Sequence, residues 1–252
     1  MSDGTMLLLI IFFAVFIGAF IQGATGLGLG LVITAILPFF LTVKETTLLV
    51  ISLLIISGLT VTCKYYKHLV WKEILGFLVV VLVGRFVAFF ILSAYGDMDF
   101  LKIWLGVVLL LIVIYQLLSA KKMDTIVELS PRRKNVSQIG LGFTAGLIGG
   151  VFGLGGPFIV LYFLLFYPQK KFSYIVSVQA VTTVASLFSI SIHAVNGDFY
   201  PSFFTYFLIG LVAVILGTNL GLRLFEKVNA TIVKRITIVL ITVSAITIIL
   251  FA

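Results

Sequence analysis

The chain has 252 residues, of which 62% are hydrophobic and only 10% are charged, and its formal net charge is +8. Soluble domains carry roughly 25% charged residues, so this composition excludes a water-soluble globular protein and places the chain in a lipid bilayer. We therefore expect no nucleic acid partner despite the positive charge. The single cysteine, Cys63, excludes a disulfide framework and a thiolate metal cluster, and we expect no metal and no cofactor.

Ten apolar segments follow one another along the chain, many of them close to the length that a bilayer-spanning helix needs. They cover residues 6–23, 26–41, 46–63, 74–93, 101–119, 138–150, 153–166, 173–194, 202–222 and 236–251. A polar connector, 120–137, separates a first half, 1–119, from a second half, 138–252. The sequence therefore predicts an all-α integral membrane protein.

The two halves resemble each other. TGLGL (25–29) aligns with FGLGG (152–156), and VLVGRFVA (81–88) aligns with VILGTNLG (214–221), which places Gly84 over Gly217. Together with the matching order of the segments, these pairs indicate an internal duplication.

The basic residues give the halves an orientation. Fourteen of the seventeen Lys and Arg residues lie in loops 64–73, 120–137, 167–172 and 223–235. Basic loops face the cytoplasm, so both termini are expected on the extracytoplasmic side of the cell (inner) membrane. Segment 74–93 then starts inside, whereas its counterpart 202–222 starts outside. We predict two inverted repeats, each a glycine-rich helical hairpin plus three transmembrane helices, an organisation typical of secondary transporters.

Glycines gather at the turn of each predicted hairpin, in GATGLGLG (23–30) and GGVFGLGG (149–156). The arms of the second hairpin, with 13 and 14 residues, are about 20 Å long, short of a hydrocarbon core of roughly 30 Å. We therefore expect this hairpin to turn within the membrane, whereas the first could cross fully. Helices beginning near Gly26 and Gly153 would present free N–H groups to an anion. Alternatively, the glycines serve close helix packing.

Arg85 lies near the middle of segment 74–93, where a charged side chain is costly and usually faces a cavity or a partner. No Asp or Glu lies inside an apolar segment to neutralise it. The guanidinium is therefore a candidate oxyanion site, the alternative being a structural lock on backbone carbonyls. The full set predicted to bind substrate is Gln22, Gly23, Thr25, Gly26, Gly28, Arg85, Gly150, Gly153, Gly155, Gly156, Gln179, Thr183 and Asn219.

The remaining polar residues suggest how transport is driven. His68 and His193 lie at segment ends and are expected at the membrane interface. Many ion-coupled carriers use intramembrane carboxylates as relays. Since the apolar segments contain none, we predict uniport, or coupling through backbone and hydroxyl oxygens.

Two stretches carry a family resemblance. QGATGLGLG (22–30) and GLIGGVFGLGGPFIVLY (146–162) are similar to the two motifs of the sulfite exporter (TauE/SafE) family, with one motif in each half. The resemblance covers the whole chain. It implies a membrane transporter that exports or takes up small sulfur oxyanions, organosulfonates or organic acids.

Other classes of function fit less well. The chain has no His-Glu-x-x-His and no Gly-x-Ser-x-Gly motif, so an enzyme is not expected. An anion channel of the same architecture is the alternative, because inverted hairpins also build pores. The expected partners are a small anionic substrate and the lipid bilayer, and a homodimer is compatible with the sequence.

Overall fold

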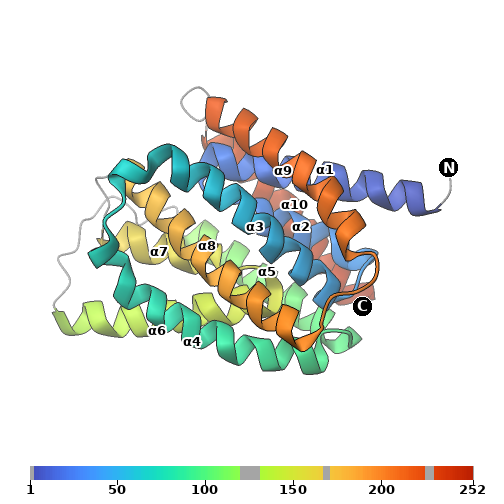
Figure 1. Cartoon of the computed structure of the whole chain (residues 1–252), viewed down its shortest axis with the longest axis horizontal. Coiled ribbons are helices and arrows are strands. Elements are labelled where there is room, and N and C mark those ends of the chain that lie inside the picture. The colour runs from blue at the N-terminus through green and yellow to red at the C-terminus, as the bar shows by residue number, and fades with distance from the viewer. Residues whose placement is uncertain (1–2, 120–130, 167–170, 225–229, 252) are drawn as a thin grey trace.

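The computed structural model describes residues 3–119, 131–166, 171–224 and 230–251, and these residues form helices joined by short turns, with no strand among them (Figure 1). The first half contains α1 (Asp3–Thr25), α2 (Leu29–Ile36), α3 (Val43–Tyr65), α4 (Trp71–Tyr95) and α5 (Asp99–Ser119). The second half contains α6 (Pro131–Phe152), α7 (Gly156–Phe166), α8 (Lys171–Asn196), α9 (Phe203–Leu224) and α10 (Ala230–Phe251). The 3-10 helices η1 (Leu37–Phe39) and η2 (Tyr66–His68) follow α2 and α3.

Six helices among the described residues are long and apolar enough to cross a membrane. These spans are Gly4–Ala24, Val43–His68, Ile74–Tyr95, Asn135–Phe152, Ser173–Asn196 and Phe203–Arg223. A helix satisfies its own backbone hydrogen bonds, which is the condition for spanning lipid. The prediction of an all-helical, multi-pass membrane protein is confirmed.

The hairpin arms differ from their predicted lengths. In each half a long helix precedes a short one: α1 has 23 residues and α2 has eight, whereas α6 has 22 and α7 has 11. The expected start of α6 at residue 138 is wrong, because the helix begins at Pro131 in the predicted connector, and proline suits the first turn of a helix. The rest of that connector, 120–130, lies outside the described residues. At 1.5 Å per residue, α2 is about 12 Å and α7 about 16 Å long.

The most extensive helix contacts join the two halves. α1 packs along α9, and α4 packs along α6 (Figure 1). Between these pairs, α3 packs against α8, while α5 packs against α10. Each of these four contacts therefore pairs a helix of the first half with a helix of the second.

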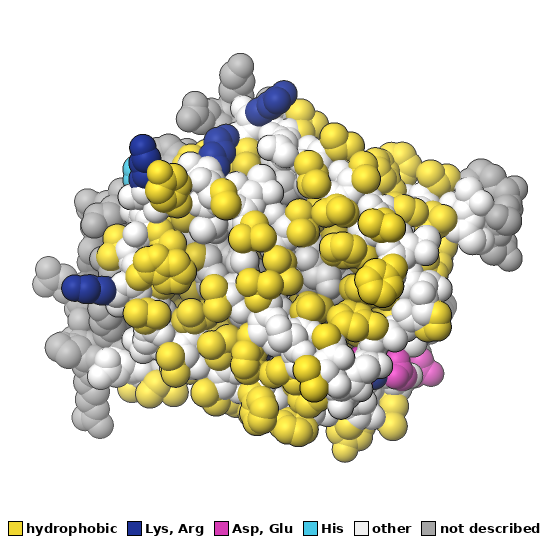
Figure 2. Space-filling model, viewed as in Figure 1, with side chains coloured by type: hydrophobic (Ala, Val, Ile, Leu, Met, Phe, Trp, Pro, Cys, Tyr) yellow, Lys and Arg dark blue, Asp and Glu magenta, His cyan; other side chains and the backbone are white. Residues whose placement is uncertain are grey.

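The surface separates into an apolar face and two polar ends. Apolar side chains are spread over most of the face in Figure 2, with Lys and Arg along its left and upper edge and Asp and Glu at its lower right. Both chain ends lie toward the right in the same view (Figure 1). Large side chains on α4 such as Phe86 and Phe90 are about half exposed, as expected of a surface that contacts lipid.

Candidate functional site

The two glycine turns touch each other at the centre of the helix bundle. Gly26 has a φ of 84° and Gly153 a φ of 73°, a backbone conformation that glycine adopts readily. A Cβ atom on Gly30 would lie 2.5 Å from the carbonyl oxygen of Gly153, and one on Gly156 would lie 2.6 Å from the side chain of Leu27. The hairpins of the two halves therefore meet at their turns.

The short helices begin at these turns. The predicted starts near Gly26 and Gly153 are wrong by three residues, since α2 begins at Leu29 and α7 at Gly156. The positive φ of each glycine keeps its turn outside the helix, and the following residues complete the turn before helical hydrogen bonding starts. Helix starts carry N–H groups without intrahelical partners. Here the N–H of Leu29 donates to the Gln22 side-chain oxygen, 3.2 Å away.

A small cavity of about 30 Å³ lies where the turns meet. Eight of the residues predicted to bind substrate line it, namely Gln22, Gly26, Gly28, Arg85, Gly153, Gly155, Gly156 and Gln179. Thr182 also contributes to the lining, as do apolar side chains such as Leu54 and Pro157. Among the described residues that line the cavity, none is acidic.

Two buried glutamines hold the first turn against its neighbours. The Nε2 of Gln22 donates to the Ser57 hydroxyl at 3.1 Å and to the Oε1 of Gln179 at 3.2 Å. The Nε2 of Gln179 donates to the carbonyl oxygen of Gly26 at 3.2 Å. Ser57 is in turn 3.2 Å from the hydroxyl of Thr218 on α9. This network fixes the turn between α1 and α2 against α3, α8 and α9.

Arg85 is buried beside the second turn, with 2% of its surface exposed. Its Nη1 donates to the carbonyl oxygen of Gly149 at 2.6 Å, and lies 3.5 Å from the Ser189 hydroxyl. Its Nε has no hydrogen-bond partner among the described residues, and no ion pair to the guanidinium is found in that part of the chain. Arg85 thus donates to a backbone carbonyl and also lines the cavity. Its surroundings are compatible with both interpretations from the sequence, the oxyanion site and the structural lock on carbonyls.

A model of the sulfite exporter TauE/SafE family matches residues 10–248. The chain belongs to this family. No curated protein and no solved structure matches the chain. Both glycine motifs lie inside the matched range, and the sulfite exporter family is one of membrane transport proteins, so the resemblance seen in the sequence is confirmed.

Other residues predicted to bind substrate do not line the cavity of this sulfite exporter family protein. Gly23 and Gly150 are positions of close packing. An added Cβ would lie 2.6 Å from the Thr218 carbonyl oxygen at Gly23, and 2.4 Å from the Ala88 side chain at Gly150. Thr183 bonds back to the Gln179 carbonyl oxygen. The side chain of Thr25 lies outside the described residues.

Asn219 also lies away from the cavity of the family member. It is exposed on α9, and its amide donates to the Ile215 carbonyl oxygen at 2.8 Å. The alignment of Gly84 with Gly217 explains why Asn219 lies outside the cavity, because it makes Thr218, and not Asn219, the residue equivalent to Arg85. Thr218 is fully buried.

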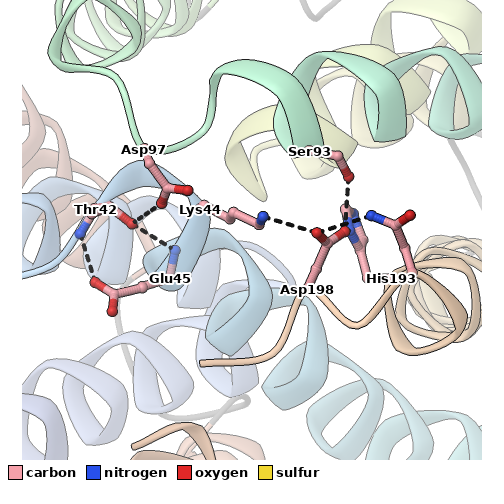
Figure 3. Close-up of polar contacts among 8 residues, drawn as sticks. Thr42, Lys44, Glu45, Ser93, Asp97, His193 and Asp198 are labelled. Atoms are coloured by element: carbon pink, nitrogen blue, oxygen red, sulfur yellow. Dashed lines mark hydrogen bonds and ion pairs between the residues drawn. The ribbon is translucent and has the colours of Figure 1, made fainter. Parts of the chain in front are cut away.

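A second polar cluster in this sulfite exporter family protein was not expected from the sequence (Figure 3). Asp198, in the turn between α8 and α9, accepts from Lys44 at 2.8 Å, from Ser93 at 2.8 Å and from Asn196 at 3.0 Å. The Nδ1 of His193 lies 2.7 Å from the same carboxylate. His193 lies in the last turn of α8, near the segment end where it was expected, and its side chain is only 2% exposed.

Local backbone geometry builds this cluster. Gly197 ends α8 with a φ of 73°, and the N–H of Asp198 then donates to the His193 carbonyl oxygen, which folds the chain back over the helix end. Burial alone would raise the pKa of Asp198, but hydrogen bonds from Lys44, His193, Ser93 and Asn196 outweigh it and hold that pKa well below its usual range. The Asn-Gly-Asp sequence after an apolar helix is the local signal for such a turn, although it does not reveal which side chains meet there.

Proposed function

We propose that this protein is a secondary transporter that carries a small anion across the cytoplasmic membrane by alternating access. The expected cargo is a sulfur oxyanion, an organosulfonate or an organic acid. The single observation that carries the proposal is the cavity between the glycine turns, which holds a buried arginine and no acidic side chain among its described lining. Membership of the sulfite exporter family supports transport over catalysis.

The chemistry of the cavity suits an oxyanion. The Nε of Arg85 has no partner within the described part of the chain, and guanidinium groups bind planar arrays of oxygen atoms through several hydrogen bonds. The starts of α2 and α7 add N–H groups and the positive ends of two helix dipoles. Thr182 and Gln179 supply neutral polar groups on the α8 side. A bound anion would therefore meet donors from both halves of the chain.

The packing of the helices supports a two-fold repeat, and the distribution of loop charges favours an inverted one. The contact of α1 with α9 and that of α6 with α4 are the same contact once the halves are exchanged, and the pairs α3–α8 and α5–α10 map onto themselves. Such pseudo-symmetry is the basis of alternating access around a site at mid-membrane. The short helices α2 and α7 would be re-entrant, because about 12 Å and about 16 Å do not cross a core of roughly 30 Å.

The charges support one orientation in the cell membrane. The end that carries Lys and Arg in Figure 2 would face the cytoplasm, and the end with Asp, Glu and both termini would face outward.

Counterflow in proteoliposomes tests this proposal. Vesicles loaded with unlabelled sulfite, thiosulfate, sulfoacetate or a plain carboxylate would receive the same labelled anion outside. We expect saturable exchange of at least one sulfur oxyanion or sulfonate, reduced at least about 100-fold in Arg85→Ala, because loss of a charged partner in a dry site costs about 3 kcal/mol or more. Arg223→Ala, a change at an exposed arginine at the end of α9, is the matched control and should exchange normally.

Two results would contradict the proposal in different ways. Flux without saturation or counterflow would favour an anion channel of the same architecture. Normal exchange by Arg85→Ala would remove Arg85 from the site. Arg85→Lys, which keeps the charge without the fork of donors, separates loss of charge from loss of geometry.

A further inference from the structure

The cluster around Asp198 joins the two halves of the chain at the end opposite to the basic loops. Lys44 comes from the first turn of α3, and Ser93 from the last turns of α4. His193 comes from the end of α8, and Asp198 from the turn that follows it (Figure 3). Every ion pair found among the described residues lies at this same end of the molecule.

The protonation of the cluster follows from its geometry. The side chains of Lys44 and Asp198 are 15% and 6% exposed, and the two form an ion pair with no net charge. Since a carboxylate only accepts hydrogen bonds, the Nδ1 of a neutral His193 carries the hydrogen and donates it to Asp198. The Nε2 is then the ring nitrogen that can take up a further proton, which would give the cluster a charge of +1.

A short path connects this cluster to the anion cavity. The Nη1 of Arg85 lies 3.5 Å from the hydroxyl of Ser189, which precedes His193 by one turn of α8. The ring of Phe89, one turn after Arg85 on α4, packs edge-on against His193 at 5.1 Å between centroids. The histidine thus lies directly beyond the cavity, toward the end that we assign to the outside.

The charges that act on His193 come from three packed elements. They are Asp198 on the α8–α9 turn, Lys44 on α3 and Arg85 on α4. Glu45 and Asp97 lie beyond Lys44, where both bind Thr42 at the start of α3. Burial opposes a proton on His193, as do the charges of Lys44 and Arg85, whereas Asp198 favours it. An anion bound to Arg85 would cancel one of the two opposing charges.

We propose that His193, oriented by Asp198, is a proton-binding site that couples anion transport to proton movement, so that the carrier is a proton–anion symporter. The inference rests on the proposed transport function, and it differs from the sequence-based expectation of uniport or of coupling through backbone and hydroxyl oxygens. An anion at Arg85 favours the proton on His193, and by linkage the proton favours the anion to the same degree. The Nε2 takes the proton from water on one side and releases it to water on the other, so no other reactant is needed.

The test compares two assays on one protein preparation. Proteoliposomes would be given [35S]sulfite, [35S]thiosulfate or [14C]sulfoacetate, first as counterflow at equal pH and then with an inward proton gradient between about pH 5.5 and pH 7.5, a range that brackets the ordinary titration of histidine. For the wild type we expect the gradient to raise accumulation at least about fivefold, the lower end of usual coupling between sites.

His193→Gln keeps an amide that can donate to Asp198 but does not titrate, so it should retain counterflow and lose the accumulation. His68→Gln, a change at the only other histidine, exposed in η2, is the matched control and should accumulate like the wild type. Because the variants receive the same anion, any titration of the anion itself cancels in the comparison.

The outcomes separate the two proposals. If no probe exchanges at all, the transport function falls, and the coupling falls with it. If exchange occurs but the gradient has no effect on the wild type, or has an equal effect on His193→Gln, only the coupling is overturned. Loss of counterflow as well in His193→Gln also counts against the coupling role, since the residue would then be needed for transport itself.

Discussion

At the scale of single residues, Arg85 shows how a guanidinium can be held in a helix bundle without a carboxylate. A carbonyl oxygen and a hydroxyl lie within hydrogen-bond distance of Nη1, and Nε has no hydrogen-bond partner among the described residues. A buried charge without a partner is costly, so a bound anion would relieve that cost. Arg85 could therefore serve both roles, holding the backbone through Nη1 and binding an anion through Nε.

The glutamine network gives a prediction at this scale. Gln179→Ala removes the donor to Gly26 and the acceptor of Gln22, so the first turn loses part of its support. We expect the KM for exchange to rise about tenfold, equivalent to about 1.4 kcal/mol or one buried hydrogen bond. Gln179→Glu should be worse, because its carboxylate would repel an anion. Ser191→Ala, which removes an exposed hydroxyl on the same helix, serves as the control. An equal KM in all variants would show that Gln179 does not support anion binding.

Asp198 gives a prediction about stability and pH. Its folded pKa is depressed, so its contribution is present above the unfolded value of about 3.9 and is lost as pH falls toward the folded pKa. Asp198→Asn should therefore lower the melting temperature in detergent at pH 7, with the difference from wild type shrinking below about pH 4. Asp99→Asn, at an exposed ion pair with Lys102, should change little. A difference that is constant with pH would argue against the ion pair.

Eight of the residues that line the cavity could be predicted from the sequence, but the contacts between them could not. Backbone turns and charged side chains are costly inside lipid, so glycine clusters and an arginine within apolar segments stand out in the sequence. Gln22, Gly26 and Arg85 could therefore be found from their positions in the sequence. Thr183 was predicted to bind substrate, but its neighbour Thr182 lines the cavity instead, because one position along a helix rotates a side chain by about 100°. The contact of Asp198 with Lys44 joins residues 154 positions apart, and no local pattern specifies it.

At the scale of elements, the glycine-to-backbone contacts set how closely the helices approach. A Cβ atom on Gly84 of α4 would lie 2.9 Å from the Gly146 Cα of α6. One on Gly221 of α9 would lie 3.0 Å from the Gly23 Cα of α1. Close backbone approach through small residues is a main source of helix association in membranes, where lipid is as apolar as the side chains.

This contact can be tested by adding volume. Gly84→Leu should separate α4 from α6 and abolish the folded state or lower its melting temperature strongly, and Gly84→Ala should do so by less. Gly140→Ala, on α6 where no atom of the described residues lies within 4 Å of the added atom, should be neutral or stabilising by about 1 kcal/mol through helix propensity. Thermal unfolding in detergent measures all three. Equal stability of Gly84→Ala and Gly140→Ala would show that the close approach is not required.

The positions of the helices were easier to predict than their ends. Ten apolar segments were predicted, and the described residues contain ten α-helices, because lipid leaves the backbone few alternatives. The ends were missed where polar residues continue a helix into water, as at Pro131, or where a glycine turn delays the start, as at Leu29 and Gly156. Hydropathy predicts which residues lie in lipid, but a helix can continue past the edge of the lipid into water.

At the scale of the whole molecule, the halves of the sequence are not the compact units of the structure. The tightest pairs, α1 with α9 and α4 with α6, each take one helix from either half. Any rocking motion would therefore move mixed pairs against the central helices α3 and α8, and the Lys44–Asp198 contact would fasten them at one end.

These shared pairs have a consequence for how such a protein could arise. Neither half alone could cover the glycine faces of α1 and α4, because the helices that cover them belong to the other half. With the halves inverted as we propose, a half-length ancestor would have needed a second copy of itself, inserted upside down, to fold at all. Fusion through the 120–137 connector would then have turned the association of two separate, oppositely oriented copies into folding within one chain.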